Sequence, residues 1–374
     1  MLTKGIFASV LLLCCARASA GANLGPQIDA LMQAYQGAVP GASVLVIHDG
    51  RIVARRAYGL ADLEAHTAAT PATAYRLASM TKQFTAAAIL LLAQDGRVSL
   101  DDKIRRWLPT LPDAAAPMTL KHLLTHTSGL IDYEDLIAEG TSRQLHDTDV
   151  LRLLEGQNRT YFPPGSSYRY SDSGYALLAL IVGRASGQDF ASFLRARIFV
   201  PLGMRDTLAY EQGISSVAHR AYGYSRSAQA WVRTDQSLTS AVLGDGGVYS
   251  SVEDLAKWDA ALYESGLLNA DSRRLAFTPA TRTDDPNIQY GLGWRITGAT
   301  VWHSGETLGF RNVIIRWPHE RLTVIVLTNR DDPEPYTLAL TIAKLLLPTA
   351  DAVRAGQVVV GPDSGARPLP QNPP

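Results

Sequence analysis

The chain has 374 residues, with 35 basic and 35 acidic side chains and a formal net charge of zero. Hydrophobic residues make up 46% of the chain and charged residues 19%, which is typical of soluble globular proteins. This length fits one large domain or two modest ones. Because the sequence has no basic field and no long acidic run, it favours neither a nucleic-acid partner nor an acidic interaction tail.

The N-terminus differs in character from the rest of the chain. Lys4 precedes an apolar run over residues 6–15, and a small-x-small sequence ends at Ala20. This pattern predicts a secretory signal peptide over residues 1–20, cleaved after Ala20. The alternative is a permanent membrane anchor, but the apolar run is too short to cross a bilayer. We therefore expect a periplasmic or secreted protein without a stable membrane span.

The mature chain is expected to lack cysteine, since Cys14 and Cys15 both lie in the predicted signal peptide. It would then form no disulfide and carry no thiol nucleophile. The eight histidines show no close ligand spacing, and the sequence contains no HExxH, P-loop, GxGxxG or GxSxG motif. We therefore expect neither a metal nor another cofactor.

The first predicted elements are a β-hairpin and a buried helix. Two β-rich runs within residues 41–62 flank Asp49-Gly50, a strong two-residue turn signal. In RLASMTKQFTAAAILLLAQDG (residues 76–96), apolar residues recur from Phe84 onward at three- and four-residue steps. The spacing predicts a helix with a buried face, which ends at Gly96.

The middle of the chain, about residues 79–270, is predicted to be mostly helical. DTDVLRLLEG, SGYALLALIVGRASG and SVEDLAKWDAALYESG each show helical spacing and end near a glycine. From Tyr290 onward, short β-rich runs separated by turns predict an antiparallel meander, and PYTLALTIAKLLLP predicts a last helix. Residues 351–374 are rich in proline and glycine and are expected to be disordered.

Strands at both ends of the chain and helices between them predict an α+β fold, not an alternating parallel sheet. We expect an antiparallel sheet formed from the N- and C-terminal segments and flanked by helices. A mostly helical region, at about residues 100–270, would be inserted between these segments. The whole domain would span residues 21–350.

Ser79 and Lys82 are the first candidates for chemistry, because they lie one helical turn apart at the start of the buried helix. A serine oxygen is a weak nucleophile until a base takes its proton, and a buried lysine can be that base. The helix N-terminus adds N–H groups that favour a developing oxyanion. An S-x-x-K sequence alone is common, however, and by itself favours an N-cap serine with an exposed lysine.

Two later segments give this pair a context. Tyr170-Ser171-Asp172 lies in a predicted loop before a helix, and His303-Ser304-Gly305 lies on a predicted strand. With SMTK, YSD and HSG in this order, the chain resembles the serine β-lactamase-related hydrolases, whose elements are S-x-x-K, Y-x-N and K-T-G or H-x-G. That family includes class C β-lactamases, D-alanyl-D-alanine carboxypeptidases, D-aminopeptidases and esterases. HLLTHTSGL, GDGGVYSS and YGLGW extend the resemblance, which runs from about Gly41 to Asn329.

The resemblance implies catalytic roles for three residues. Ser79 would be the nucleophile that forms an acyl-enzyme, and Lys82 would help to remove its proton. Tyr170 would act as the base in acylation and pass the proton to the leaving group. Because a phenol is a poor base near neutral pH, Tyr170 and Lys82 would work as one coupled system.

The resemblance also implies substrate-binding roles on the late strand for His303, Ser304, Gly305 and Glu306. His303 would hydrogen-bond the substrate or carry partial positive charge there; the alternative is a histidine packed within the sheet. Gly305 would allow the substrate to approach the backbone closely. The N–H groups of Ser79 and Glu306 would form the oxyanion hole.

Asp172 departs from the family pattern, where asparagine is usual. An ionised aspartate only accepts hydrogen bonds, so it could not donate one to an amide carbonyl of a substrate. It could pair with Lys82 and keep that lysine protonated, which puts efficient β-lactam hydrolysis in doubt. Alternatively, Asp172 caps the helix that follows it.

The other conspicuous residues are expected to be structural. We expect His122 and His126 to pack or to cap a short helix, and Gly244-Asp245-Gly246-Gly247 to form a tight turn near the site. Tyr133 is expected to line the cleft. The tryptophans expected in the sheet and core are Trp294, Trp302 and Trp317.

These observations predict an exported serine hydrolase that acts on a small-molecule or peptide substrate through an acyl-enzyme. Ester or D-peptide cleavage ranks above β-lactam hydrolysis because of Asp172. The alternative function is a catalytically silent module that recognises cell-wall peptides or a protein partner.

Overall fold

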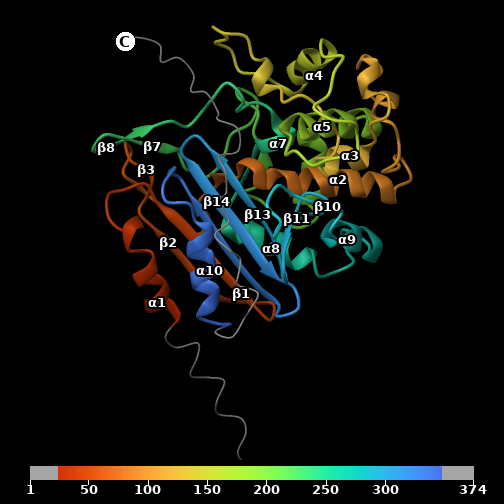
Figure 1. Cartoon of the computed structure of the whole chain (residues 1–374). Coiled ribbons are helices and arrows are strands. Elements are labelled where there is room, and N and C mark those ends of the chain that lie inside the picture. Colours follow the sequence, from red (N-terminus) through yellow and green to blue (C-terminus); the bar gives the residue numbers. More distant parts are fainter. Residues whose placement is uncertain (1–23, 348–374) are drawn as a thin grey trace, which may run out of the picture.

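An eight-stranded antiparallel sheet organises the fold (Figure 1). The computed structural model describes residues 24–347, so the predicted signal peptide and the predicted disordered tail lie outside the described residues. Across the sheet the strands are β10 (Thr281–Arg282), β11 (Gln289–Tyr290), β12 (Arg295–Thr297), β13 (Thr300–Thr307), β14 (Phe310–Trp317), β15 (Leu322–Thr328), β1 (Ala42–His48) and β2 (Arg51–Tyr58). Because β1 pairs with β15, both ends of the described chain meet in one sheet. The predicted α+β fold is confirmed.

The predicted first hairpin is formed by β1 and β2. His48 pairs with Arg51 across the turn. Asp49 and Gly50 have φ angles of 52° and 72°, in the left-handed region. Two such residues in succession form a turn whose twist matches that of the flanking strands, which is why Asp-Gly is a strong hairpin signal.

Both faces of the sheet are covered, and the strand residues alternate between two hydrophobic cores. Leu45 pairs with Ile325, and both belong to the core shared with the helical region. The next residue, Val46, pairs with Val324, and both belong to the core beneath the terminal helices. The central strands are therefore apolar on both sides, because successive side chains point to opposite faces.

Helices lie on both faces of this sheet. Figure 1 shows α1 and α10 in front of the sheet, α8 behind it, and α2 to α5 gathered beside it. The helices are α1 (Leu24–Leu31), α2 (Lys82–Gln94), α3 (Leu120–Leu124), α4 (Asp147–Glu155), α5 (Asp172–Ser186), α6 (Phe190–Leu194), α7 (Leu243–Gly246), α8 (Val252–Ala261), α9 (Ala270–Phe277) and α10 (Tyr336–Lys344).

Short elements connect these helices. The smaller sheets contain β3 (Leu60–Asp62) with β4 (Thr67–Ala68), β5 (Tyr75–Arg76) with β9 (Val248–Ser250) and β6 (Leu208–Ala209), and β7 (Tyr224–Ser227) with β8 (Ala230–Arg233). The single-turn helices are η2 (Gln33–Tyr35), η3 (Ala78–Thr81), η4 (Ile104–Arg106), η5 (Asp113–Ala115), η6 (Glu134–Leu136) and the π-helical η7 (Arg195–Phe199).

Helix α2 is buried on all sides, not on one face. Every residue from Lys82 to Leu92 is buried, and Phe84 packs edge-on against Phe199 and in a tilted arrangement against Trp258. Burying such a side chain contributes about 1.5–3 kcal/mol. Gly96, with a φ of 69°, follows the end of the helix as predicted. The helix is therefore a rigid support for the side chains at its first turn.

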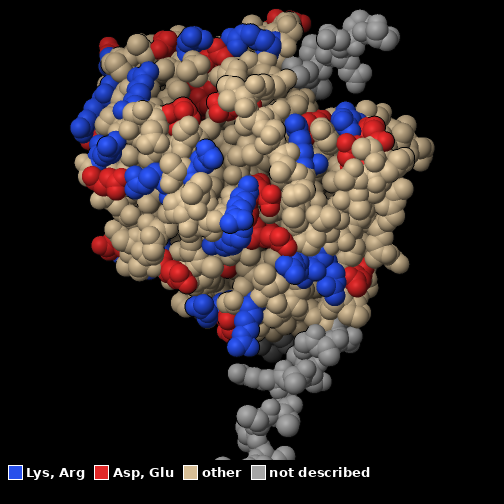
Figure 2. All heavy atoms as spheres, turned by 180° about the vertical axis from the view of Figure 1, so that it is seen from behind, with Lys and Arg blue, Asp and Glu red and all other residues tan. Residues whose placement is uncertain are grey.

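The surface carries charges of both signs. On the face in Figure 2, Lys and Arg are interspersed with Asp and Glu, between large areas of other residues. This agrees with the formal net charge of zero and shows no field of one sign on that face. Within residues 24–347, none of the helices has the length and apolar character needed to cross a bilayer.

Candidate active site

Ser79 and Lys82 meet where the buried helix begins. Ser79 lies in the turn η3, and Lys82 is the first residue of α2. Lys82 Nζ donates a hydrogen bond to Ser79 Oγ over 3.0 Å. Lys82 is fully buried, whereas Ser79 keeps 6% of its surface exposed. The alternative of an N-cap serine with an exposed lysine is therefore wrong.

The Lys82 ammonium is held by two further oxygen atoms. It forms an ion pair of 2.5 Å with Asp172 Oδ1 and donates to the Asp245 carbonyl over 3.0 Å. The N-cap of α5 is Ser171, whose hydroxyl accepts the N–H of Gly174. The alternative in which Asp172 caps this helix is wrong, because its carboxylate turns toward Lys82, 90 positions earlier in the chain.

Tyr170 lies beside the same ammonium. Lys82 Nζ is 4.8 Å from the centre of the Tyr170 ring, and the Arg295 guanidinium is 5.2 Å from it on another side. The ring stacks on His126 at 4.3 Å between centroids. His126 also accepts the N–H of Ser171 over 3.1 Å, which ties it to the loop that carries Tyr170. The structure thus brings Ser79, Lys82 and Tyr170 together.

More carboxyl groups lie around the ion pair. Burial raises the pKa of Asp245 well above its usual range, and the negative charge of Asp172 raises it further. Burial and the same charge raise the pKa of Asp132 to about 6. Because these two carboxyl groups retain their protons more readily than usual, Asp172 is the carboxylate that balances Lys82. The sequence motifs placed the segment around Asp245 near the site but did not indicate the roles of its carbonyl or of Asp132.

Tyr133 donates a hydrogen bond to one of these carboxyl groups. Its hydroxyl donates to Asp245 Oδ2 over 3.0 Å, and only 1% of the residue is exposed. Burial, followed by the Asp245 charge, raises the Tyr133 pKa well above its usual range. The prediction that Tyr133 lines the cleft is therefore wrong: it is a buried donor behind the site.

The glycine-rich segment near residue 245 is helix α7 and Gly247, not a simple tight turn. The Asp147 carboxylate accepts the N–H groups of Leu243 and Gly244 over 3.0 and 3.1 Å. A Cβ on Gly244 would lie 2.2 Å from the Tyr175 carbonyl oxygen, so the glycine is required by the close approach of α5. Burial raises the pKa of Asp147 to about 6.

His303 is fully buried in β13, and both of its ring nitrogens have partners. Nε2 lies 3.1 Å from the Tyr290 hydroxyl, and Nδ1 lies 2.6 Å from the Ser304 carbonyl oxygen. Burial, and then the nearby Arg295 charge, lowers the His303 pKa well below its usual range. Of the alternatives for His303, the partial positive charge is therefore wrong, whereas packing within the sheet is confirmed. The imidazole is neutral, and the cation near this wall is Arg295 on β12.

Gly305 has a role other than the one expected. A Cβ on Gly305 would lie 1.9 Å from the Leu77 carbonyl oxygen and 3.1 Å from the Met80 nitrogen. The close approach at Gly305 is therefore that of the segment carrying Ser79, not that of a substrate. The contact places β13 directly against η3. The adjoining Glu306 side chain turns toward Arg311, with 3.5 Å between Oε2 and Nε.

The structure does not bring the Ser304 side chain to the site. Ser304 pairs with Val313, which packs in the core beneath α10, whereas His303 pairs with Ile314 in the opposite core. Side chains alternate along a strand, so His303 and Gly305 face Ser79 and Ser304 faces away. Ser304 is fully buried, and its hydroxyl has no hydrogen-bond partner among residues 24–347.

The structural roles expected for two histidines and three tryptophans are confirmed. His122 and Thr119 form a capping box at the start of α3. His126 packs among aromatic rings, and burial lowers its pKa well below its usual range. The tryptophans buried as predicted are Trp294, Trp302 and Trp317. Within the described part of the chain, no group of three or more His, Cys, Asp or Glu residues is arranged to hold a metal ion.

Comparisons with known proteins identify the family of the chain. A family model described as Beta-lactamase matches residues 28–347. Penicillin-binding protein 4* of Bacillus subtilis (strain 168) is 33% identical over 317 residues, which cover 80% of this chain and 70% of that protein. The chain spans only 62% of the length of the Staphylococcus aureus (strain MRSA252) relative called Protein flp, with 29% identity and 81% of this chain covered.

Solved structures show the same fold. The octameric penicillin-binding protein homologue from Pyrococcus abyssi has a TM-score of 0.78 and 27% identity, covering 87% of this chain and 77% of that one. The D-amino acid amidase from Ochrobactrum anthropi SV3, in complex with L-phenylalanine amide, has a TM-score of 0.74 and 25% identity. The match covers 87% of this chain and 98% of the amidase chain. With a family model matched over nearly all the described residues, the chain belongs to the Beta-lactamase family.

Proposed function

We propose that the protein is an exported serine hydrolase that cleaves ester or amide bonds through an acyl-enzyme on Ser79. The observation that carries this proposal is the 3.0 Å hydrogen bond from Lys82 Nζ to Ser79 Oγ, made in a buried network beside Tyr170. Membership of the Beta-lactamase family supports it. Export rests on the sequence pattern of residues 1–20 alone.

The surroundings of Lys82 decide which group takes the proton of Ser79. An ammonium group has three donors and no acceptor, and Lys82 Nζ is within hydrogen-bond distance of three oxygen atoms. The ammonium form therefore matches its surroundings. We assign the base to Tyr170, whose ring lies 4.8 Å from Lys82 Nζ and 5.2 Å from the Arg295 guanidinium.

The reaction follows from these positions. Ser79 Oγ attacks the substrate carbonyl carbon while its proton passes to the Tyr170 oxygen. The N–H groups of Ser79 and Glu306 stabilise the resulting oxyanion, a role supported by the contact between β13 and η3 at Gly305. The bond to the leaving group then breaks, and the leaving group takes the proton from Tyr170. Water releases the acyl group as an acid and restores Ser79.

Asp172 determines the proposed ranking of substrates. Its carboxylate is committed to Lys82 and has no proton to donate, so it cannot hydrogen-bond an amide carbonyl on a β-lactam side chain. We therefore place simple esters and D-amino-acid amides or peptides ahead of β-lactams. The similarity to the D-amino acid amidase supports this order, whereas the similarity to penicillin-binding proteins keeps β-lactams as the second class.

The first prediction is that Ser79→Ala abolishes covalent labelling by a fluorophosphonate probe and lowers hydrolysis at least about 10³-fold. Wild type, Ser79→Ala and the control Ser142→Ala, an exposed serine, would be assayed in parallel. The substrates would be a p-nitrophenyl ester, D-alanyl-D-alanine and a chromogenic cephalosporin. Labelling of Ser79→Ala equal to that of wild type would contradict the proposal. Binding of D-peptides without Ser79-dependent turnover would instead support the silent recognition module.

A further inference from the structure

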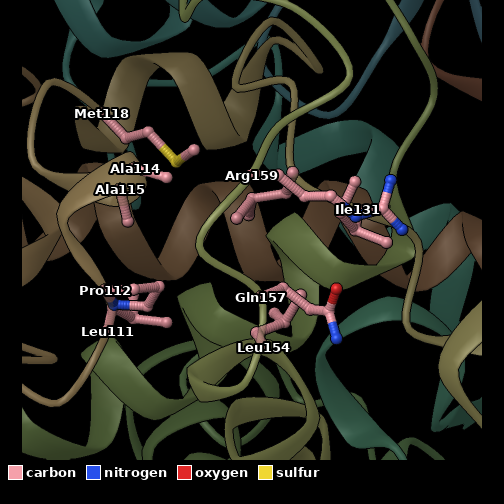
Figure 3. Close-up of a pocket in the computed structure, with 10 residues that line it drawn as sticks. Leu111, Pro112, Ala114, Ala115, Met118, Ile131, Leu154, Gln157 and Arg159 are labelled. Atoms are coloured by element: carbon pink, nitrogen blue, oxygen red, sulfur yellow. The ribbon is translucent and has the colours of Figure 1, made fainter.

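Two cavities outside the site differ greatly in size. The cavity in Figure 3, between Leu111, Ile131 and Leu154, has a volume of about 10 Å³. That is room for about one water molecule, so it is a packing defect. A second, open cavity of about 670 Å³ lies at the C-terminal half of α5, next to α4, α6 and α7. This is within the range of small-molecule sites, roughly 300–1,000 Å³.

The larger cavity is mainly apolar. Its apolar lining includes Leu180, Phe190, Tyr210 and Leu243, and it extends to Ile214, which is 80% exposed. An isoleucine this exposed at the rim of an apolar cavity is a feature of binding surfaces. None of Ser79, Lys82 and Tyr170 lines the cavity, which lies at the Leu243 side of α7.

The polar lining favours a cation. Three carboxyl groups border the cavity: Asp147, Asp189 and Glu211. Asp147 accepts two N–H groups of α7, and Asp189 caps α6 by accepting the N–H of Ser192. Glu211 is half-buried, and its carboxylate has no hydrogen bond or ion pair to any residue within 24–347. A partly buried carboxylate beside apolar surface is a favourable partner for a cation with an apolar body.

The cations at the rim do not fill this role. The Arg184 guanidinium donates to the Trp107 carbonyl. His146 is exposed and lies close enough to lower the Glu211 pKa slightly against the larger effect of burial, which raises it. No ion pair is formed by Glu211 among residues 24–347, and after burial the nearby Asp189 charge raises its pKa further, so added positive charge would stabilise this carboxylate.

We propose that this cavity is a second binding site, distinct from the Ser79 site, for a ligand with an apolar body and a cationic amine head. The apolar body would lie against Leu180 and Phe190, and the head would pair with Glu211. The proposal does not depend on the hydrolase function. It can be tested with protein that has no catalytic activity.

The test uses three probes with one aromatic body: 2-(1-naphthyl)ethylammonium, 2-(1-naphthyl)ethanol and 1-naphthylacetate. Isothermal titration calorimetry at pH 7.5 on Ser79→Ala protein should show one site per chain. The ammonium should bind about tenfold more tightly than the alcohol, and the carboxylate more weakly still. Equal affinity for the three probes would overturn the proposal.

Variants locate the site. Glu211→Gln should reduce the affinity for the ammonium about tenfold, to that of the alcohol, while the control Glu320→Gln, an exposed residue of the β14–β15 turn, leaves it unchanged. Leu180→Trp should fill the cavity and abolish binding of all three probes. If Leu180→Trp does not fold, Glu211→Gln alone tests the site. An affinity for the ammonium probe equal to that of the unsubstituted site would overturn the assignment.

Discussion

The two walls of the Ser79 site have opposite characters. On the helical side, Lys82 and Asp172 form a buried ion pair, with Asp245 and Asp132 close by. On the sheet side, β13 presents a neutral His303 bonded within the protein and a glycine in contact with the backbone of η3. The helical wall therefore holds the charged groups of the site, and the sheet wall fixes the position of Ser79.

This difference predicts that the two walls tolerate substitution differently. The helical network is made of charges out of water, so losing one member leaves its partner uncompensated. The sheet wall depends on a close steric contact, where one added carbon atom is enough to separate β13 from η3. The following predictions test this division.

The largest effect is expected for Lys82→Met. Loss of the ammonium removes the contact to Ser79 and leaves Asp172 without its ion-pair partner. We expect the hydrolysis rate to fall about 10³-fold. The free energy of unfolding should fall by about 3–5 kcal/mol, as measured by urea denaturation. The exposed Lys121→Met is the matched control.

A double variant separates these two losses. Lys82→Met with Asp172→Asn removes both charges, so it should regain much of the stability but none of the rate. Recovery of the rate as well would mean that Lys82 acts only by neutralising Asp172.

Next in size is Gly305→Ala, which probes the sheet wall. Its Cβ would lie 1.9 Å from the Leu77 oxygen, so β13 and η3 must move apart. We expect a loss of about 1–3 kcal/mol in the free energy of unfolding. The rate should fall about 10²-fold, because Ser79 is displaced from its partners. Gly266→Ala, with no atom near its Cβ, should change neither quantity. Wild-type kinetics in Gly305→Ala would refute this role.

A pH-dependent stability is expected from Asp147, which holds α7 in place. Because its pKa is about 6 in the folded protein and about 3.9 in an unfolded chain, the folded state binds more protons between these values. The free energy of unfolding should therefore decrease as the pH rises from about 4 to about 6, by up to about 3 kcal/mol.

Asp147→Asn checks this assignment. Denaturation at pH 4, 5, 6 and 7 should show that the free energy of unfolding decreases less steeply with pH in the variant than in wild type. Part of the decrease should remain, because Asp132 also has a raised pKa, about 6. A slope identical to that of wild type would show that Asp147 is ionised throughout. Asp271→Asn, at an exposed carboxylate of α9, should preserve the full wild-type slope.

The smallest effect is a change of preference in Asp172→Asn. An asparagine can donate to an amide carbonyl, so turnover of a cephalosporin should rise, while ester hydrolysis falls as Lys82 loses its ion pair. We expect the ratio of the two kcat/KM values to shift about tenfold. An unchanged or lower cephalosporin rate would mean that Asp172 does not limit β-lactam turnover.

Much of this protein could be predicted from local patterns in its sequence. The Asp49-Gly50 turn, the buried helix after Ser79 and the apolar late strands depend on neighbours a few residues apart, so their signals survive without the fold. The ordered motifs at residues 79, 170 and 303 likewise identified the family. Of the two roles considered for Asp172, only pairing with Lys82 is realised; Ser171 caps α5, because two adjacent polar residues both suit an N-cap and only one is used.

Only the tertiary structure determined the remaining features of the site, because these features depend on which elements contact one another. Asp172 forms an ion pair with Lys82 only because the start of α5 lies against the start of α2. His303 is neutral because packing excludes water from its ring. Position 305 requires glycine because the Leu77 carbonyl oxygen occupies the place that a Cβ would take. Burial and close contact between residues far apart in the chain leave no local periodicity, and so only the folded molecule shows them.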